Sequence, residues 1–442
     1  MVDELPHKLA IVVGGGPAPG INSVIGAATI RAILQGVEVL GIRDGFRDIM
    51  NGDADGIRPL SMGDVSRIHF RGGSVLGTSR ANPTSDERYL ETAVSTLRRV
   101  GVTQLITIGG DDTAFSAMKI AERADGAIRV VHVPKTIDND LDLGPEVDTF
   151  GYQTARHVGV ELVKNLMVDA HTTSRWYFVV AMGRKAGHLA LGIGKAAGAT
   201  LTLIPEEFPR HSTTITALVD TLAGAIIKRR AEGRLDGVAV LAEGLGESLP
   251  DEERDRLGAI ERDDHGHVRL SEIDIGDSLK KATARRLGAL GVDAVIVAKN
   301  IGYELRCADP IPFDMEYTRD LGYCAAKYLF SGGNRAMISL KAGQFVAIPF
   351  ARMLDPETGR TRVRMVDLQS TRYAIARRYM IRLRRDDFAD AGAVGRFAAV
   401  AHLTPEEFRR QFEYLVEHEA PPLDLLHRTD SSPEPGGRAT EG

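Results

Sequence analysis

Short apolar runs recur along this chain, and each leads into a loop rich in glycine or polar residues and then into a helical pattern. The first run is Leu9–Val13, which precedes the glycine-rich loop Gly14–Gly20 and a helical pattern that begins at Ile21. A strand, a crossover helix and a second strand in this order favour a right-handed connection and a parallel sheet. Further runs that we interpret as strands are 37–42, 104–108, 130–133, 176–181, 201–204, 238–241 and 294–297. Because the alternation extends through both halves, we expect an α/β fold with two doubly wound, Rossmann-like lobes that face each other across a cleft.

Size, charge and cysteine content narrow the function classes. The 442 residues exceed what one hydrophobic core usually serves, and 43% of them are hydrophobic, which is ample for two cores. The near balance of 55 basic and 60 acidic residues, a net charge of −5, argues against a nucleic-acid partner and a membrane-surface protein. Cys307 and Cys324 are too few for a disulfide scaffold. With a polar N-terminus and apolar runs too short to span a bilayer, the sequence predicts a cytoplasmic protein.

The stretch Pro134–Asp140 carries the densest chemistry, and it directly follows the predicted strand 130–133. In open α/β sheets, ligands bind in the crevice at the carboxyl ends of the strands. The carboxylates of this stretch could take a proton from a hydroxyl or hold a metal, and its lysine could neutralise phosphate. Taken alone, the stretch could also be a capped loop with a surface ion pair.

Two other loops are candidates for phosphate or metal binding. The glycines of Gly14–Gly20 allow the backbone to approach a phosphate closely, although a plain tight turn explains them too. Pro19 occupies the position of the third glycine of a dinucleotide fingerprint, and Ile21 that of the P-loop lysine, which argues against both of those sites. Asp111 and Asp112 open the next predicted helix, where they could cap it or bind Mg²⁺.

Four segments together resemble the 6-phosphofructokinase family, namely Gly14–Asn22, Gly109–Thr113, Pro134–Asp140 and Met182–Arg184. They occur in the family's order and at its approximate spacing, and the resemblance runs from about Leu9 to Tyr328. The resemblance implies a phosphofructokinase-like fold, phosphoryl transfer to a sugar phosphate in the cleft, and Mg²⁺ as the cofactor. Phosphoryl transfer needs a positioned hydroxyl, a base, a metal and cations near the phosphates, and these segments contain the matching residue types.

The resemblance also implies roles for single residues. Asp138 would be the base that accepts the proton of the 1-hydroxyl of fructose 6-phosphate, and Asp140 would support it or the metal-bound phosphate. Thr136 would contact the transferred group, Asp111 would hold Mg²⁺, and Arg80 would grip the phosphates of the donor. The catalytic set is completed by Arg184.

The sugar-phosphate site implied by the family reaches beyond these residues. Its matching positions are Thr136, Asp138, Arg175, Met182, Gly183, Arg184, Glu243, Tyr303 and Arg306, with Lys299 near the place of an interface arginine that has no match here. Tyr303 stands where bacterial ATP-using relatives generally carry histidine, and a phenol can still donate to a phosphate. Arg175 matches an arginine that reaches across a subunit interface, so the resemblance implies a homodimer or homotetramer.

Two departures from the ATP-using members concern the donor. Asp112 and Lys135 stand where those members usually have glycine. The Asp112 side chain would place bulk and negative charge in the path of a nucleotide α-phosphate, whereas Lys135 can neutralise the terminal phosphate of a small donor. The pair, with Pro17 in the first glycine loop, resembles the pyrophosphate-dependent branch and implies reversible transfer from pyrophosphate to fructose 6-phosphate. The expected donor-binding residues are Gly15, Gly16, Arg80, Asp112 and Lys135.

Three alternatives stay open at this point. The chain could be an ATP-dependent 6-phosphofructokinase in which Asp112 does not exclude the nucleotide. It could use the same donor with sedoheptulose 7-phosphate as acceptor. It could also be a non-catalytic subunit that binds a sugar phosphate on the same fold, because fold does not imply activity.

The sequence further predicts how the chain is divided. We expect residues 1–149 and about 306–345 to form a donor lobe, and residues 150–305 and part of 346–428 to form a sugar-phosphate lobe. Residues 429–442, rich in Ser, Pro, Gly and charge, predict a disordered tail. The basic stretch Arg372–Arg385 could be a solvated helix face, part of a phosphate site or a subunit contact.

Overall fold

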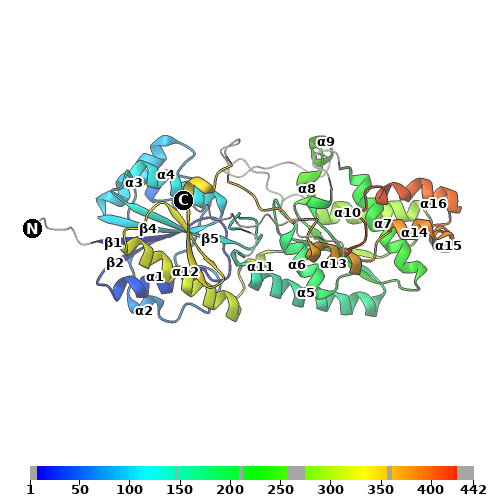
Figure 1. Cartoon of the computed structure of the whole chain (residues 1–442), viewed down its shortest axis with the longest axis horizontal. Helices are drawn as coiled ribbons and strands as arrows, with labels where there is room; N and C mark the ends of the chain where they lie inside the picture. The colour runs from blue at the N-terminus through cyan, green and yellow to red at the C-terminus, as the bar shows by residue number, and fades with distance from the viewer. Residues whose placement is uncertain (1–6, 145–146, 209–212, 256–273, 356–360, 426–442) are drawn as a thin grey trace, which may run out of the picture.

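The computed structural model describes residues 7–144, 147–208, 213–255, 274–355 and 361–425, and the predicted tail 429–442 lies outside them. Two lobes lie side by side, each built around its own sheet with helices on both faces (Figure 1). The predicted α/β class with two doubly wound lobes is thereby confirmed. Among the described residues, no helix combines the length and the apolar character needed to cross a bilayer.

The larger sheet has the strand order β12-β11-β5-β4-β1-β2-β3, with β6 paired to β5. Its strands are β1 (Lys8–Val13), β2 (Glu38–Ile42), β3 (Ile57–Pro59), β4 (Val102–Gly109), β5 (Arg129–Thr136), β6 (Phe150–Gly151), β11 (Ala336–Lys341) and β12 (Gln344–Pro349). The edge strands β3 and β12 pair antiparallel to their neighbours, and β1, β2, β4, β5 and β11 run parallel. The order β5-β4-β1 therefore brings the three loops that follow these strands to one edge of the sheet.

Both faces of this sheet are buried, as expected for parallel strands. Leu9, Ile11 and Val13 of β1 pack in the core that contains helices α1 and α12. Ala10 and Val12 point to the opposite face and pack in the core that contains α3 and α4. These helices are α1 (Ile21–Ile33), α3 (Glu87–Arg99), α4 (Asp111–Ala124) and α12 (Pro312–Phe330).

The smaller sheet is parallel and has the strand order β10-β7-β9-β8. Its strands are β7 (Trp176–Ala181), β8 (Leu201–Leu203), β9 (Gly237–Ala242) and β10 (Ile296–Ile301), and its helices are α5 (Tyr152–Thr173), α6 (His188–Ala197), α7 (Ile215–Ala231) and α10 (Ile275–Ala289). Helix α5 packs beside α6, and α7 packs beside α10 on the other side of the sheet (Figure 1). The carboxyl ends of β7 and β9 point toward the larger sheet, so loops from both lobes meet in one cleft.

The hairpin β11–β12 was not among the predicted strands. Its two strands are joined by Ala342 and Gly343, which have φ angles of 49° and 75°. Two consecutive residues with positive φ form the type I′ turn that suits a two-residue hairpin. Because Ala342 is an unusual residue for such a turn, the local sequence lacks the Asn-Gly or Asp-Gly signal that normally reveals it.

The C-terminal part of the chain passes from one lobe to the other. After β12, residues 361–367, which we call the strap, run between the lobes and lead to helices packed on the second lobe (Figure 1). These helices are α13 (Thr371–Tyr379), α14 (Arg385–Ala389), α15 (Ala391–Val400) and α16 (Pro405–Phe412).

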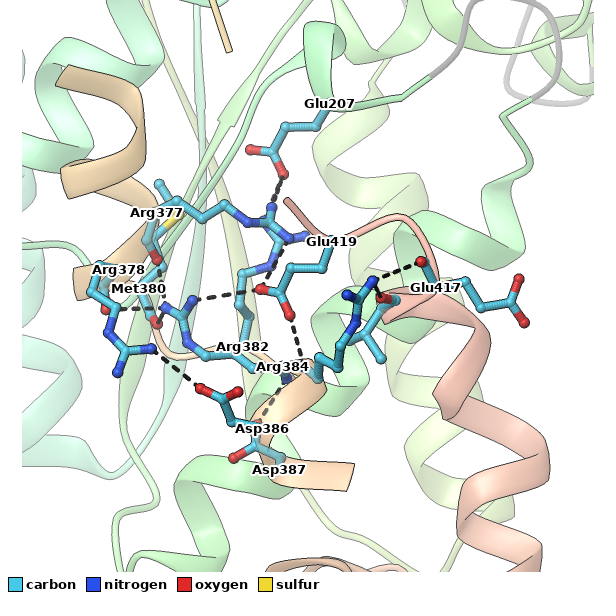
Figure 2. Close-up of polar contacts among 12 residues, drawn as sticks. Glu207, Arg377, Arg378, Met380, Arg382, Arg384, Asp386, Asp387, Glu417 and Glu419 are labelled. Atoms are coloured by element: carbon cyan, nitrogen blue, oxygen red, sulfur yellow. Dashed lines mark hydrogen bonds and ion pairs between the residues drawn. The ribbon is translucent and has the colours of Figure 1, made fainter. Parts of the chain in front are cut away.

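The predicted basic stretch Arg372–Arg385 contains the arginines that hold this C-terminal part in place (Figure 2). Arg377 and Arg382 contact the carboxylate of Glu207 at 3.2 and 2.6 Å. Arg384 donates to carbonyl groups at the end of α13 and directly after it, including that of Met380 at 3.0 Å. These arginines therefore make structural contacts within the chain, whereas the sequence had left a phosphate site and a subunit contact open.

Candidate active site

The loops after β1, β4, β5, β7 and β9, with the short helix α11 (Tyr303–Arg306), enclose a cavity of about 190 Å³. The predicted site residues that line it are Gly15, Gly16, Arg80, Asp111, Asp112, Lys135, Thr136, Asp138, Asp140, Met182, Arg184, Glu243, Tyr303 and Arg306. Gly183 adjoins them, and its N–H donates to Glu243 Oε2 at 3.3 Å. Residues that are far apart in the sequence and that were selected by type and position thus converge on one cleft.

Besides Gly183, two predicted residues do not line this cavity as far as the described part of the chain shows, namely Arg175 and Lys299, and these two lie away from it. Arg175 precedes the first residue of β7, at the opposite end of the strand from the cleft. Lys299 is exposed on the edge strand β10. A single chain therefore does not bring either side chain to the cleft.

Asp138 and Asp140 both line the cleft, and they flank a residue with an unusual backbone conformation. Strand β5 ends at Thr136, whose Oγ1 accepts a hydrogen bond from the Asp138 N–H at 3.0 Å. Asn139 has a φ of 58°, in the left-handed region, and the carboxamide Nδ2 donates to Asp148 Oδ1 at 2.9 Å. Asparagine tolerates this backbone conformation better than most residues, so the sequence Asp-Asn-Asp suits the turn.

The surroundings of Asp138 shift its pKa toward the range that suits a general base. Burial raises the pKa of its carboxyl group to about 6, and the neighbouring Glu243 adds to the rise. Arg184 and Lys135 oppose it, and the Arg184 N–H lies 3.4 Å from Asp138 Oδ2. A carboxylate with a pKa just below neutrality is mostly ionised at pH 7 yet basic enough to accept a proton during a reaction.

Asp140 and Asp111 form a negatively charged pole beside Asp138. Burial raises the pKa of Asp140 to about 7, and repulsion from Asp138 and Asp111 contributes. Burial would also raise the pKa of Asp111, but Lys185 and Arg184 outweigh it and hold the pKa below the usual range. The Lys185 Nζ lies 3.3 Å from Asp111 Oδ2.

This pole fits a divalent cation that is also bound by phosphate. The mutual repulsion of the buried carboxylates marks a place where added positive charge is favourable. In the described parts of the chain, no three His, Cys, Asp or Glu side chains are grouped closely enough to hold a metal unaided. Magnesium is typically held by one or two carboxylates together with phosphate oxygens and water, which matches this donor set.

A buried cation, Lys135 of β5, lies against the glycine loop that follows β1. Lys135 is 5% exposed, and its Nζ donates to the carbonyl of Gly16. Burial lowers the pKa of Lys135 to about 8, while Asp138 favours its charged form. A Cβ atom on Gly16 would lie 3.0 Å from Arg306 Nη1, so glycine at this position leaves room for the Arg306 guanidinium.

Arg306 is oriented by an aromatic ring. Its guanidinium carbon lies 4.6 Å from the centroid of the Tyr303 ring, within the range of a cation–π contact. Its buried Nε has no hydrogen-bond partner among the described residues. Tyr303 therefore acts on the site by holding Arg306 as well as by lining the cavity.

Sequence reasoning missed two residues that shape this site. Lys185 directly follows Arg184, but the sequence pattern predicted no role for it. The only local signal was the presence of a second cation beside the arginine, and the structure shows that this cation contacts Asp111. Arg364 of the strap contacts the loop after β5, and no local pattern links two segments so far apart in sequence.

The arrangement suits transfer of a phosphoryl group to a hydroxyl. One wall supplies glycine-loop backbone, Lys135 and the carboxylates of Asp111 and Asp112, and the other supplies Arg184 and Glu243. Asp138 lies where the walls meet. A charged donor could thus be held against an acceptor hydroxyl next to a base, which is the positioning that phosphoryl transfer requires.

Known proteins resemble this chain in sequence and in fold. A sequence model of the phosphofructokinase family, described as "Phosphofructokinase", matches residues 8–329. A pyrophosphate–fructose 6-phosphate 1-phosphotransferase of Thermotoga maritima is 52% identical over 418 residues, covering 93% of this chain and 100% of the relative. A protein of the same name from Naegleria fowleri is 49% identical and covers 92% of this chain and 96% of its own. The crystal structure of a pyrophosphate-dependent phosphofructokinase from Nitrosospira multiformis superposes with a TM-score of 0.66 at 16% identity, over 85% of this chain and 91% of that one.

Proposed function

The chain belongs to the phosphofructokinase family, and we propose that it catalyses reversible phosphoryl transfer from pyrophosphate to the 1-hydroxyl of fructose 6-phosphate. The observation that carries this proposal is the placement of Asp112 and Lys135 on the donor side of the cleft, where both line the cavity. Two relatives that match more than nine-tenths of the chain are named for the same reaction.

The first step is the binding of both substrates to opposite walls. The glycine loop and Lys135 hold pyrophosphate, with Arg80 as a further cation at the mouth of the cleft. Arg184, Glu243 and Arg306 hold the sugar phosphate. The acidic Asp112 side chain disfavours the α-phosphate of a nucleotide, because like charges repel strongly where burial lowers the effective dielectric constant.

In the transfer step, the C1 oxygen of the sugar forms a bond to the terminal phosphorus of pyrophosphate as the bond to the bridging oxygen breaks. The Asp138 carboxylate accepts the proton of the 1-hydroxyl, and inorganic phosphate leaves. Lys135 neutralises the charge that grows on the leaving phosphate. In the reverse direction, the protonated Asp138 returns its proton to the sugar oxygen.

We propose Mg²⁺ as the metal of this site, held by Asp111 with support from Asp140. When bound, it neutralises charge on the phosphate oxygens. Lys185 forms an ion pair with Asp111 in the structure, so its ammonium group balances the charge of the Asp111 carboxylate.

The proposal also covers the division into lobes, the oligomeric state and the compartment. The donor lobe comprises residues 1–149 and about 306–345, and the sugar-phosphate lobe comprises residues 150–305 and part of 346–428. The enzyme is a homodimer or homotetramer in which Arg175 of one subunit reaches the acceptor site of another. The two free cysteines suit a reducing compartment, the cytoplasm.

Phosphorus NMR of the purified protein tests the proposal. With Mg²⁺, pyrophosphate and fructose 6-phosphate, we expect signals of fructose 1,6-bisphosphate and inorganic phosphate, and with those two products we expect pyrophosphate. Parallel samples with ATP in place of pyrophosphate, and with sedoheptulose 7-phosphate as acceptor, distinguish the alternative substrates. Absence of transfer from either donor would contradict the proposal and favour a non-catalytic sugar-phosphate-binding protein.

A further inference from the structure

The guanidinium group of Arg364 lies among backbone carbonyl groups of the loop that follows β5. Its Nε and Nη2 donate to the Asn139 carbonyl at 3.1 and 3.0 Å, and Nη1 donates to the carbonyls of Gly144 and Val147 at 2.8 and 2.7 Å. The backbone N–H of Arg364 also donates to the Asp140 carbonyl at 2.8 Å. Because guanidinium presents five N–H donors in a rigid fork, one side chain can fix several points of a loop at once.

Asn139 is the central point of these contacts. It is 5% exposed, it has the left-handed backbone conformation, and Arg364 Nη2 additionally contacts its side-chain Oδ1. It stands between Asp138 and Asp140, so its conformation sets the direction in which both carboxylates enter the cleft. A misplacement of about 1 Å in an active site can lower a rate by about 100-fold, so the support of this residue matters for catalysis.

The strap also contacts the second lobe. The carbonyl of Arg364 accepts a hydrogen bond from His188 Nε2 at 3.1 Å, and the Val366 N–H donates to Glu206 Oε1 at 2.9 Å. The same Glu206 oxygen accepts from the Gly187 N–H at 2.9 Å. Gly187 and His188 close the loop that begins with the predicted acceptor residues after β7. The strap therefore ties together one loop from each wall of the cleft.

The far end of the strap is anchored as well. Glu207, which adjoins Glu206 in the turn Pro205–Glu207, accepts Arg377 and Arg382 (Figure 2). Neighbouring carboxylates of one turn thus hold the strap and the arginines that follow it. The strap and the arginines that follow it lie beyond residue 329, where the match to the family model ends, whereas their partners lie within the matched residues.

We propose that Arg364 is a positioning residue for phosphoryl transfer, which the C-terminal strap carries into the interface of the lobes to hold Asn139, and with it Asp138 and Asp140, in the reactive arrangement. The expected effect on kcat rests on the proposed function. The expected effect on the conformation of the loop after β5 does not depend on catalysis. Arg364 touches no substrate in this account, so it acts on the rate and not on binding.

The test compares Arg364→Ala, Arg364→Lys and the matched control Arg362→Ala. Arg362 lies two residues away on the same strap and its side chain is exposed. We expect Arg364→Ala to lower kcat by about 100-fold while the KM for pyrophosphate and for fructose 6-phosphate changes by less than about threefold. Lysine can donate to fewer carbonyls, so Arg364→Lys should recover part of kcat, and Arg362→Ala should match the wild type.

Hydrogen exchange of the same proteins without substrates separates this proposal from the proposed function. We expect Arg364→Lys to speed exchange in peptides from 136–144 and 147–149, with other peptides and those of Arg362→Ala unchanged. An active wild type together with an Arg364→Lys variant of unaltered kcat and unaltered exchange would overturn the positioning role. An inactive wild type would contradict the proposed function, and the exchange result would still decide the role of the strap. If Arg364→Ala fails to fold, the Arg364→Lys data alone decide the outcome.

Discussion

The two walls of the cleft differ in how complete they are within one chain. The donor wall comes from loops after β5, β4 and β1, which are neighbours in one sheet, and every predicted donor residue lines the cavity. The acceptor wall also follows parallel strands, but Arg175, which the family pattern assigns to it, and Lys299, which lies near the place of an unmatched arginine, are away from the cavity that the described residues form. The donor site is therefore assembled by folding alone, whereas the acceptor site as we propose it needs a second subunit.

The largest expected effect comes from Asp138, which stands where the two walls meet. Replacement of Asp138 by Asn removes the base but keeps the shape, and we expect kcat to fall by about 10³-fold or more. Binding of fructose 6-phosphate, measured by calorimetry, should change little. If the variant retains most of its kcat, Asp138 is not the base, and the reaction is not centred on the residue at which the two walls meet.

Next in size is a change to the donor wall alone. Lys135→Met keeps the length of the buried side chain and removes its charge, so we expect kcat/KM for pyrophosphate to fall by about 100-fold. Titrations of both substrates at fixed concentrations of the other provide the measurement. The KM for fructose 6-phosphate should stay within a few-fold, and an equal loss for both substrates would show that the two walls do not act separately.

A smaller effect is expected on the acceptor wall. Arg175→Ala should raise the KM for fructose 6-phosphate by about 10-fold, because one charged hydrogen bond to a phosphate is lost, and should leave the KM for pyrophosphate unchanged. Mixing this variant with an Asp138→Asn variant sharpens the comparison. If Arg175 acts across an interface, mixed oligomers should contain sites that have both residues intact, and activity above the sum of the parents is expected. If the mixture shows no such gain in activity, Arg175 does not act across a subunit interface.

The smallest expected effect concerns stability. The pKa of Asp140 is raised to about 7 in the folded protein, so between about pH 4 and 7 the folded state holds more protons than the unfolded state. The free energy of unfolding should therefore fall as the pH rises through this range. Asp140→Asn carries no charge, and we expect its Tm without metal or phosphate to exceed that of the wild type by a few degrees at pH 8. The difference should disappear near pH 4, and a constant difference across the range would contradict this explanation.

The parts of the site that could be predicted from the sequence are those in which a short segment contains both the strand and its chemistry. Pro134–Asp140 is one example, since its position after an apolar run placed its carboxylates at the edge of a sheet. The contact of Lys185 with Asp111 joins two lobes, and the side-chain contacts of Arg364 join segments more than 200 residues apart, as with Val147 at a separation of 217. Such pairings depend on tertiary packing and leave no periodic signal in the sequence.

The basic stretch Arg372–Arg385 is a second case in which the sequence did not reveal the tertiary contacts. Its composition was visible in the sequence, but its partners Glu207 and Glu419 come from distant segments, so charge alone could not distinguish a structural network from a phosphate site. The hairpin β11–β12 was missed because its turn uses Ala342 in a conformation that favours glycine or asparagine.

We propose that Asp112 and Lys135 of the donor wall restrict the donor to pyrophosphate. The most direct measurement is the rate of fructose 1,6-bisphosphate formation by the double variant Asp112→Gly with Lys135→Gly, with ATP and pyrophosphate in parallel and the wild type beside it. We predict that the wild type uses pyrophosphate and leaves ATP almost unused, and that the double variant gains activity with ATP and loses most of its activity with pyrophosphate. Equal use of both donors by the wild type, or a folded double variant that still ignores ATP, would contradict the claim.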